Sequence, residues 1–380
     1  MIPRGFRFSG IRCGLKNKRN DLGMIVSDRE AVAAGLFTQN QVRAACVDLT
    51  KQAISDGRLR AVVVNSGNAN CFTGAQGEAD AREMVALAAE QIGAPANKVA
   101  IAQTGVIGKA MDMERARHGI RAAAGALAEA PNEFLEAILT TDLVTKSAYR
   151  RVGDAVIFGA AKGSGMIAPN MATMLAFLVT DLVTTPEELR EALAAANDLS
   201  FGCLTVDGDT STNDMVLALA NGASDYRAPR HELRHAMTEV CIDLAEQIAR
   251  DGEGATKLVR VTVHGSDDPK RIALTIANSP LVKTAIFGCD PNWGRIVAAA
   301  GRSGVPIDLA RARLTFVIDG ESWVLVENGA PATFDPASVS HAMKAATLDV
   351  VLDLGSGPTA TIFTCDFGYG YVRINAEYHT

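Results

Sequence analysis

One threonine of the sequence lies where its side chain could act as a nucleophile. Residues 162–181 read KGSGMIAPNMATMLAFLVTD, so that Gly, Pro and Asn residues precede Ala172 and Thr173, and an apolar, strand-like run follows. A threonine hydroxyl is a weak nucleophile, but a free α-amine on the same residue, with a pKa of about 8, can act as its base. That amine exists only if the chain is cut before Thr173. A buried threonine at the start of a strand is the simpler interpretation of the same pattern.

Two other patterns resemble metal sites but lack required parts. Residues 231–235, HELRH, match the H-E-x-x-H zinc pattern, yet they lie in a highly charged stretch just after Pro229 that is typical of a solvated first helical turn. Residues 207–218 begin like a calcium loop, but Thr212 stands in place of the required Gly and Ala218 in place of the required Glu. The sequence has no P-loop and no G-x-G-x-x-G fingerprint. We therefore expect no metal and no nucleotide cofactor.

The elements that must position Thr173 alternate between strand and helix in the first half of the chain. Short β-branched runs predict strands at 60–65 and 98–103, and apolar spacing predicts helices at 78–92 and 113–128. Thr185-Pro186-Glu187-Glu188 offers an N-cap, a first-turn Pro and a capping-box Glu for a helix after 185.

Strands dominate the last third, after a further helix predicted at 231–250. The predicted strands are 258–264, 271–276, 313–318, 323–326, 350–354 and 361–365, with hairpin turns at Asp319-Gly320 and Asn328-Gly329. Mixed βα alternation and antiparallel pairs predict an α/β or α+β fold in which helices cover the sheets.

Composition limits the classes of partner. A length of 380 residues predicts two or three compact units at about one per 150 residues. The net charge of −6 argues against a nucleic-acid or anionic-membrane partner. Seven Cys without CxxC spacing predict a reducing compartment, the cytoplasm. We expect no secretory signal and no transmembrane helix, because the most apolar run, 166–179, is too short and contains Pro169 and Asn170.

Over essentially its whole length the chain resembles the ornithine acetyltransferase family, the glutamate N-acetyltransferases of arginine biosynthesis. Beside 162–181, the likeness rests, in the family's order, on 65–77 (NSGNANCFTGAQG), 102–108 (AQTGVIG), 139–142 (LTTD), 206–214 (VDGDTSTND), 251–257 (DGEGATK), 278–296 (NSPLVKTAIFGCDPNWGRI) and 371–380 (YVRINAEYHT). Each motif alone is weak, and together they are specific. Residues 5–21 match only loosely and contain none of the implied site residues.

The resemblance implies a fold and a maturation step. The fold is a layered α/β (α+β) sandwich, similar to the aminopeptidases that cut themselves to expose a nucleophile. The precursor is cleaved between Ala172 and Thr173 into an α chain, 1–172, and a β chain, 173–380. Two of each associate as a heterotetramer.

The resemblance also implies the reaction. An acetyl group passes from N-acetylornithine to glutamate through an acetyl ester on Thr173, in a ping-pong cycle without metal or nucleotide. A bifunctional member also makes N-acetylglutamate from acetyl-CoA. The sequence holds no feature that separates the two kinds of member.

Site residues follow from the same resemblance. Thr104 and Gly105 supply the oxyanion hole. The substrate is bound by Thr173 together with Thr140, Lys162, Glu253, Asn375 and Thr380. From side-chain chemistry, Lys162 could pair with a carboxylate and Glu253 with an ammonium group. Residue types alone favour simpler interpretations: a strand-ending turn at 104–105, a solvated Lys162, a helix-capping Glu253 and a frayed tail at 375–380.

Three alternatives stay open beside this activity. A self-processing amidohydrolase or aminopeptidase of the related fold would also be cut at Thr173 but would pass the acyl group to water, and a sequence does not reveal whether water is excluded. A non-enzymatic binding or scaffold protein would keep an intact chain, which the complete catalytic set argues against. A zinc protease based on residues 231–235 is the most remote alternative, and metal analysis tests it.

Overall fold

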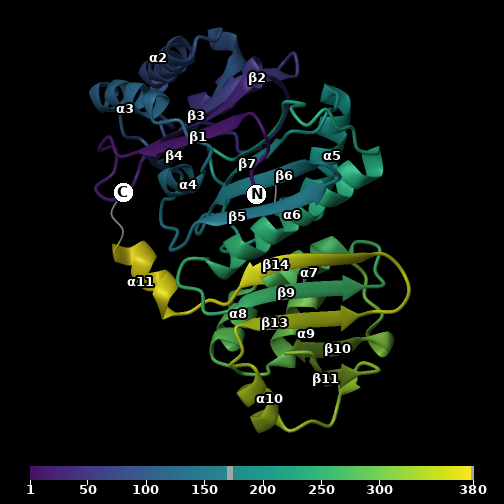
Figure 1. Ribbon diagram of the computed structural model, residues 1–380. Helices are drawn as coiled ribbons and strands as arrows, with labels where there is room; N and C mark the ends of the chain where they lie inside the picture. Colours follow the sequence, from purple (N-terminus) through teal and green to yellow (C-terminus); the bar gives the residue numbers. More distant parts are fainter. Residues whose placement is uncertain (169–173, 378–380) are drawn as a thin grey trace. The chain divides into compact units, whose positions relative to one another are not determined.

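The computed structural model describes residues 1–168 and 174–377, which divide into two compact units. Unit 1 consists of residues 1–202 and 209–244, and unit 2 of residues 203–208 and 245–377 within the described chain (Figure 1). Ala172, Thr173 and Thr380 lie outside the described residues. The expected chains, 1–172 and 173–380, are products of a covalent cut that a division into folded units does not test, and they stay predictions.

Unit 1 is built on a sheet ordered β4-β3-β2-β8-β7-β6-β5, with β1 paired to β2. Its strands are β1 (Phe6–Ile11), β2 (Leu22–Phe37), β3 (Arg58–Asn68), β4 (Val99–Val106), β5 (Lys146–Val152), β6 (Ala155–Lys162), β7 (Leu175–Thr180) and β8 (Met215–Ala220). The long β2 belongs to both halves of the sheet, because its first residues pair with β1 and β3 and its last with β8. Its register with β3 shifts between Val26 and Ala31.

Helices cover both halves of the unit 1 sheet (Figure 1). They are α1 (Ala45–Ala53), α2 (Gly74–Ile92), α3 (Met113–Gly125) and α4 (Asn132–Ala137) on the β1–β4 half, and α5 (Pro186–Asp198) and α6 (Arg230–Arg250) on the other. Aromatic rings join the halves in the core: Phe134 of α4 stacks edge-on against Phe177 of β7 at 5.5 Å and tilts against Phe8 of β1 at 6.1 Å. The expected layered α/β class is confirmed.

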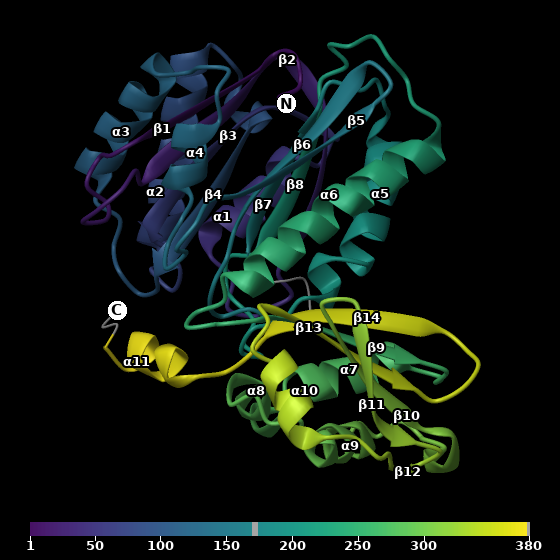
Figure 2. The ribbon, with the colours of Figure 1, turned by 60° about the horizontal axis from the view of Figure 1, so that its bottom comes forward.

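Unit 2 is a six-stranded sheet ordered β12-β11-β10-β13-β9-β14, with α7 and α9 on one face (Figure 2). Its strands are β9 (Leu258–His264), β10 (Arg313–Ile318), β11 (Glu321–Glu327), β12 (Ala330–Pro331), β13 (Thr347–Asp353) and β14 (Thr359–Cys365). Its helices are α7 (Pro269–Ala277), α8 (Pro280–Phe287), α9 (Trp293–Gly301), α10 (Pro336–Ala342) and α11 (Tyr369–Glu377). Only the β9–β13 pair is parallel among these described strands.

Local signals in the sequence predicted most of these elements. The capping box is confirmed: Thr185 Oγ1 accepts from Glu188 N, and Glu188 Oε2 accepts from Thr185 N, each at 3.2 Å. Both hairpin turns are confirmed, since Asp319 and Asn328 each have a φ of 50°.

The strand predicted at 271–276 is wrong, because these residues lie in α7. Asp268 caps this helix by accepting from Arg271 N at 3.0 Å, and Pro269 is its first residue. The buried residues Ile272, Ala273, Ile276 and Ala277 share one helical face. A six-residue window cannot separate this spacing from strand alternation.

The capping box generates a stability prediction. Replacing Thr185 by Ala removes the hydroxyl that accepts from Glu188 N, so the free energy of unfolding should fall by about 1 kcal/mol in urea denaturation. Thr185→Ser keeps the hydroxyl and should stay close to the wild type. Equal losses in both variants would contradict a capping role.

Candidate functional site

Thr104 and Gly105 lie near the end of β4, in close contact with the end of β3. Gly105 has a φ of 131°, and a Cβ on it would come within 2.4 Å of the carbonyl carbon of Gly67 and 2.5 Å of Asn68 N. Asn68 stands opposite both Thr104 and Val106, which marks a bulge in the pairing. β4 continues through this point, so the interpretation as a strand-ending turn is wrong, and only glycine fits at 105.

Buried amide side chains fix the peptide that precedes Thr104. Asn213 Nδ2 donates to the carbonyl oxygens of Gln103, at 2.8 Å, and Ala69, at 2.7 Å. The Gln103 side chain donates to Asn65 Oδ1 at 2.9 Å and accepts from Asn70 Nδ2 at 3.1 Å. A satisfied buried network of this kind rigidifies its surroundings without adding a charge.

The residues after Asn213 hold the start of β7. Met215 N donates to the carbonyl oxygen of Met174 at 3.1 Å, and Met174 directly follows Thr173 in the sequence. Leu175 pairs with Met215 of β8 and with Lys162 of β6. Thr104, Lys162 and the residue after Thr173 therefore come together at one end of unit 1.

Lys162 and Thr140 contact each other. Lys162 is the last residue of β6 and only 8 % exposed, and its Nζ donates to Thr140 Oγ1 at 3.4 Å. The interpretation of Lys162 as a solvated side chain is therefore wrong. Burial of an ammonium group is costly and requires partners of opposite charge or hydrogen-bond acceptors.

The buried carboxylate of Asp142 supplies the opposite charge. Its Oδ1 accepts from Lys146 Nζ and Gly163 N, both at 2.7 Å, and its Oδ2 accepts from Thr140 N at 2.9 Å. Burial, the largest effect, would raise the pKa of Asp142, but the Lys146 and Lys162 ammonium groups and these hydrogen bonds outweigh it and lower the pKa to about 2. Asp142 and Lys146 are not among the residues that the resemblance implies, although Asp142 ends the quoted LTTD motif.

Glu253 and Asn375 form a separate pair in unit 2. Glu253 is 9 % exposed, and its Oε2 accepts from Asn375 Nδ2 at 2.8 Å. Asn375 lies in α11, so the chain is helical and not frayed at this point. A Cβ on Gly254 would come within 2.2 Å of Tyr371 N, so glycine allows α11 to approach the Glu253 loop. Tyr371, whose hydroxyl donates to Asp207 Oδ2 at 3.3 Å, supports the pair and is not among the implied residues.

Residues 1–168 and 174–377 give little support to a metal site or to a thiol nucleophile. No group of three or more His, Cys, Asp or Glu side chains there could hold a metal ion. His231 and His235 are exposed at the start of α6, which confirms the prediction of a solvated first turn. Burial raises the pKa of the Cys46 thiol to about 12, so this thiol stays protonated. No helix in these residues is long and apolar enough to cross a membrane.

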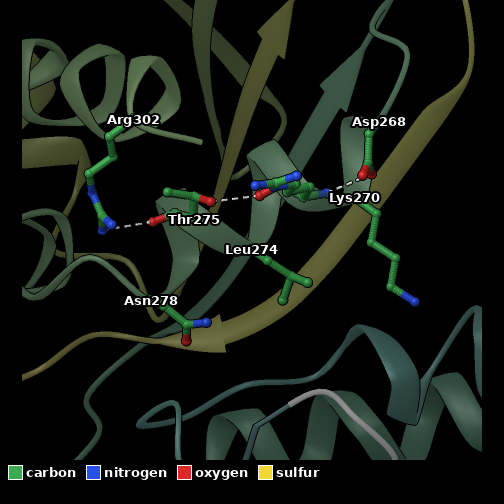
Figure 3. A pocket seen from close by; sticks show the side chains of 7 residues that line it. Asp268, Lys270, Leu274, Thr275, Asn278 and Arg302 are labelled. Atoms are coloured by element: carbon green, nitrogen blue, oxygen red, sulfur yellow. Dashed lines mark hydrogen bonds between the residues drawn. The ribbon is translucent and has the colours of Figure 1, made fainter. Parts of the chain in front are cut away.

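A hollow of about 430 Å³ in unit 2 contains none of the implied site residues (Figure 3). Lys270 and Arg302 stand on opposite sides of it. Arg302 Nη2 donates to Thr275 O at 3.4 Å, and Asp268 accepts from Arg271 N. Its charged groups do not converge on one point, and we assign it no ligand.

Comparisons with known proteins identify relatives over the full length. A family model described as the ArgJ family matches residues 7–380. The arginine biosynthesis bifunctional protein ArgJ of Oceanobacillus iheyensis is 46% identical and covers 100% of this chain and 95% of its own length. The protein of the same name from Geobacter sulfurreducens is 46% identical and covers 100% of both. The crystal structure of arginine biosynthesis bifunctional protein ArgJ from Bacillus halodurans is 39% identical, with a TM-score of 0.51 over 54% of this chain and 100% of that one.

Gly105 should be intolerant of substitution. Gly105→Ala places a Cβ against the Gly67–Asn68 backbone at a φ that L residues rarely adopt, so urea denaturation should show a loss of about 2 kcal/mol or more. Gly108→Ala is the matched control, because Gly108 also has a positive φ but has open space around it. Equal losses in the two variants would rule out the close strand contact as the cause.

The Asp142 charge should appear in the pH dependence of stability. Because the pKa of Asp142 is lowered from 3.8 to about 2, its carboxylate stabilises the fold above pH 3.8, and this contribution is lost as the pH falls through about 2. The stability gap between the wild type and Asp142→Asn should therefore narrow by about 2 kcal/mol between pH 4 and pH 2. Asp154→Asn, at an exposed position, is the control and should differ little in stability from the wild type. A gap for Asp142→Asn that does not change with pH would contradict the assignment.

Proposed function

The chain belongs to the ArgJ family and is an acyltransferase, and we propose that it transfers the acetyl group of N2-acetyl-L-ornithine to L-glutamate in arginine biosynthesis. The observation that carries the proposal is the arrangement at one end of unit 1. There, Asn213 and Met215 link the peptide before Thr104 to the residue after Thr173. A nucleophile and its oxyanion donors must lie close together to act on one carbonyl, and these links support that arrangement.

The precursor first cuts itself. The Thr173 hydroxyl adds to the carbonyl carbon of Ala172, the carbon–nitrogen bond breaks, and the nitrogen takes the proton to become the α-amine of Thr173. Water then hydrolyses the resulting ester, which leaves a carboxylate on Ala172 and restores the Thr173 hydroxyl. Base and nucleophile now belong to one residue, so no further entropy is lost in bringing them together.

Transfer uses the same two groups. The α-amine of Thr173 accepts the hydroxyl proton as the oxygen attacks the acetyl carbonyl, and Thr104 and Gly105 stabilise the oxyanion, each donor by about 3–4 kcal/mol. Ornithine leaves with the proton on its amine. The amine of glutamate then attacks the acetyl ester and regenerates Thr173. One amide is exchanged for a similar one, so the overall reaction should be nearly thermoneutral and reversible.

Charged side chains would bind the charged groups of the substrate. The Lys162 ammonium group, beside Thr140, pairs with a carboxylate, and the Glu253 carboxylate, oriented by Asn375, pairs with an ammonium group. The carboxyl-terminal residue Thr380 contributes to the same binding. N2-acetyl-L-ornithine carries both of these charges, a carboxylate and a side-chain ammonium group, whereas the amine of glutamate must be neutral to attack the ester.

Further parts of the proposal rest on the family. The name of the curated relatives includes the word bifunctional, which supports acetyl-CoA as a second acetyl donor for glutamate. The cleaved chains, 1–172 and 173–380, would associate as a heterotetramer of two copies each in the cytoplasm. The reaction requires neither a metal nor a nucleotide cofactor.

Intact mass and activity together test the proposal. The purified wild type should give two fragments that meet between Ala172 and Thr173, and Thr173→Ala should give one uncut chain. With N-acetylornithine as the donor, the cleaved enzyme should form N-acetylglutamate when glutamate is present and release little acetate when glutamate is absent. Thr104→Ala should lower kcat about 10²- to 10³-fold because an oxyanion donor is lost, whereas Thr104→Ser keeps the hydroxyl and should lose far less.

Two results would contradict the proposal. An intact wild-type chain would exclude a nucleophile at a new amino terminus. A cleaved protein that releases acetate at the same rate with and without glutamate would be a hydrolase.

A further inference from the structure

The loop of residues 12–20 joins β1 to β2 and concentrates positive charge. It contains Arg12, Lys16, Lys18 and Arg19, and it matches the family only loosely. Two of these cations, Lys16 and Arg19, donate hydrogen bonds to the segment that carries Thr140.

Lys16 and Arg19 bind the carbonyl groups on either side of Thr140. Lys16 Nζ donates to Leu139 O at 2.8 Å and to Ser66 Oγ at 2.9 Å. Arg19 Nη1 donates to Asp142 O at 2.8 Å. The first carbonyl immediately precedes Thr140, and the second follows it by two residues. The two cations therefore hold both sides of the turn that contains Thr140.

The Asp142 carboxylate holds the same turn from the inside. It accepts from Thr140 N at 2.9 Å and from Gly163 N, next to Lys162, at 2.7 Å. Thr140 Oγ1 faces Lys162 Nζ at 3.4 Å. The position of Thr140 relative to Lys162 thus depends on the cationic loop as well as on Asp142.

The loop is built to keep Lys16 in place. The buried Asp21 carboxylate accepts from Cys13 N, Gly14 N and Lys16 N at 2.7–3.1 Å. A Cβ on Gly67 would come within 2.9 Å of Lys16 Cβ, so the loop packs tightly onto the end of β3.

Holding these two cations costs free energy. Burial lowers the pKa of Lys16 to about 8, and Arg19 adopts a left-handed φ of 65° that non-glycine residues rarely take. Such costs persist where other contacts over-determine the conformation, and they concentrate at functional sites.

We propose that Lys16 and Arg19 are positioning residues that fix Thr140, and through it Lys162, in the geometry that receives the substrate carboxylate; this rests on the proposed acetyl transfer. They act on the backbone of the Thr140 turn and do not touch the reacting atoms. Their loss should weaken substrate binding more than it slows the chemical steps.

Steady-state kinetics with N-acetylornithine test the proposal. Lys16→Met and Arg19→Gln each remove a charge-assisted hydrogen bond, so KM should rise about tenfold or more, while kcat changes less than about threefold. Lys16→Arg and Arg19→Lys keep a donor and should recover part of the loss. Lys18→Met is the matched control, because Lys18 is exposed and makes no hydrogen bond or ion pair with the described residues, and its KM should stay within about twofold of the wild type.

Hydrogen exchange tests, without substrate turnover, whether Lys16 and Arg19 hold the turn that contains Thr140. The peptide that contains residues 139–142 should exchange faster in Lys16→Met and in Arg19→Gln than in the wild type or Lys18→Met. Arg19 is exposed, so its variant should remain folded even if Lys16→Met does not.

Three results would overturn the proposal. They are a KM within twofold of the wild type in both Lys16→Met and Arg19→Gln, an equal rise of KM in Lys18→Met, or an unchanged rate of hydrogen exchange in residues 139–142. The first two leave the proposed function intact. A wild type that transfers no acetyl group would instead refute the proposed function. The hydrogen-exchange measurement alone would then decide whether Lys16 and Arg19 fix the turn.

Discussion

The buried carboxylate of Asp142 is the interaction on which the charged side of unit 1 depends. It bonds Lys146, the backbone of Thr140 and the backbone of Gly163, and so connects the loop after α4 to the ends of β5 and β6. Removing it would take away a carboxylate that pairs with the fully buried Lys146 ammonium group, and breaking one half of such a pair is strongly destabilising. Thr140 and Lys162 would lose their common support at the same time.

In the unit 1 site, different kinds of side chain support Thr104 and the Thr140–Lys162 pair. Neutral amides of Asn65, Asn70, Gln103 and Asn213 hold the strand end at Thr104. Ions hold the Thr140–Lys162 side, where a charged end of the substrate would bind. The division suits a reaction in which negative charge develops transiently at one point while permanent substrate charges stay elsewhere.

Features that depend on neighbouring residues could be predicted from the sequence. The capping box at Thr185, the Asp319-Gly320 turn and β9 follow from residues within a few positions of one another. Residue types alone favoured a solvated Lys162, and only the resemblance marked it as a site residue. Asp142 and Lys16 could not be identified, because their importance lies in contacts made across 21 and 123 residues of chain.

The proposed transfer depends on an acetyl ester of Thr173 that forms between the two half-reactions. The direct measurement is rapid-quench intact mass of the purified protein mixed with N-acetylornithine in the absence of glutamate. The fragment that begins at Thr173 should gain the mass of one acetyl group and lose it when glutamate is added. An unmodified fragment during active transfer would exclude an acetyl ester on Thr173, because the acetyl group would then pass directly from one substrate to the other.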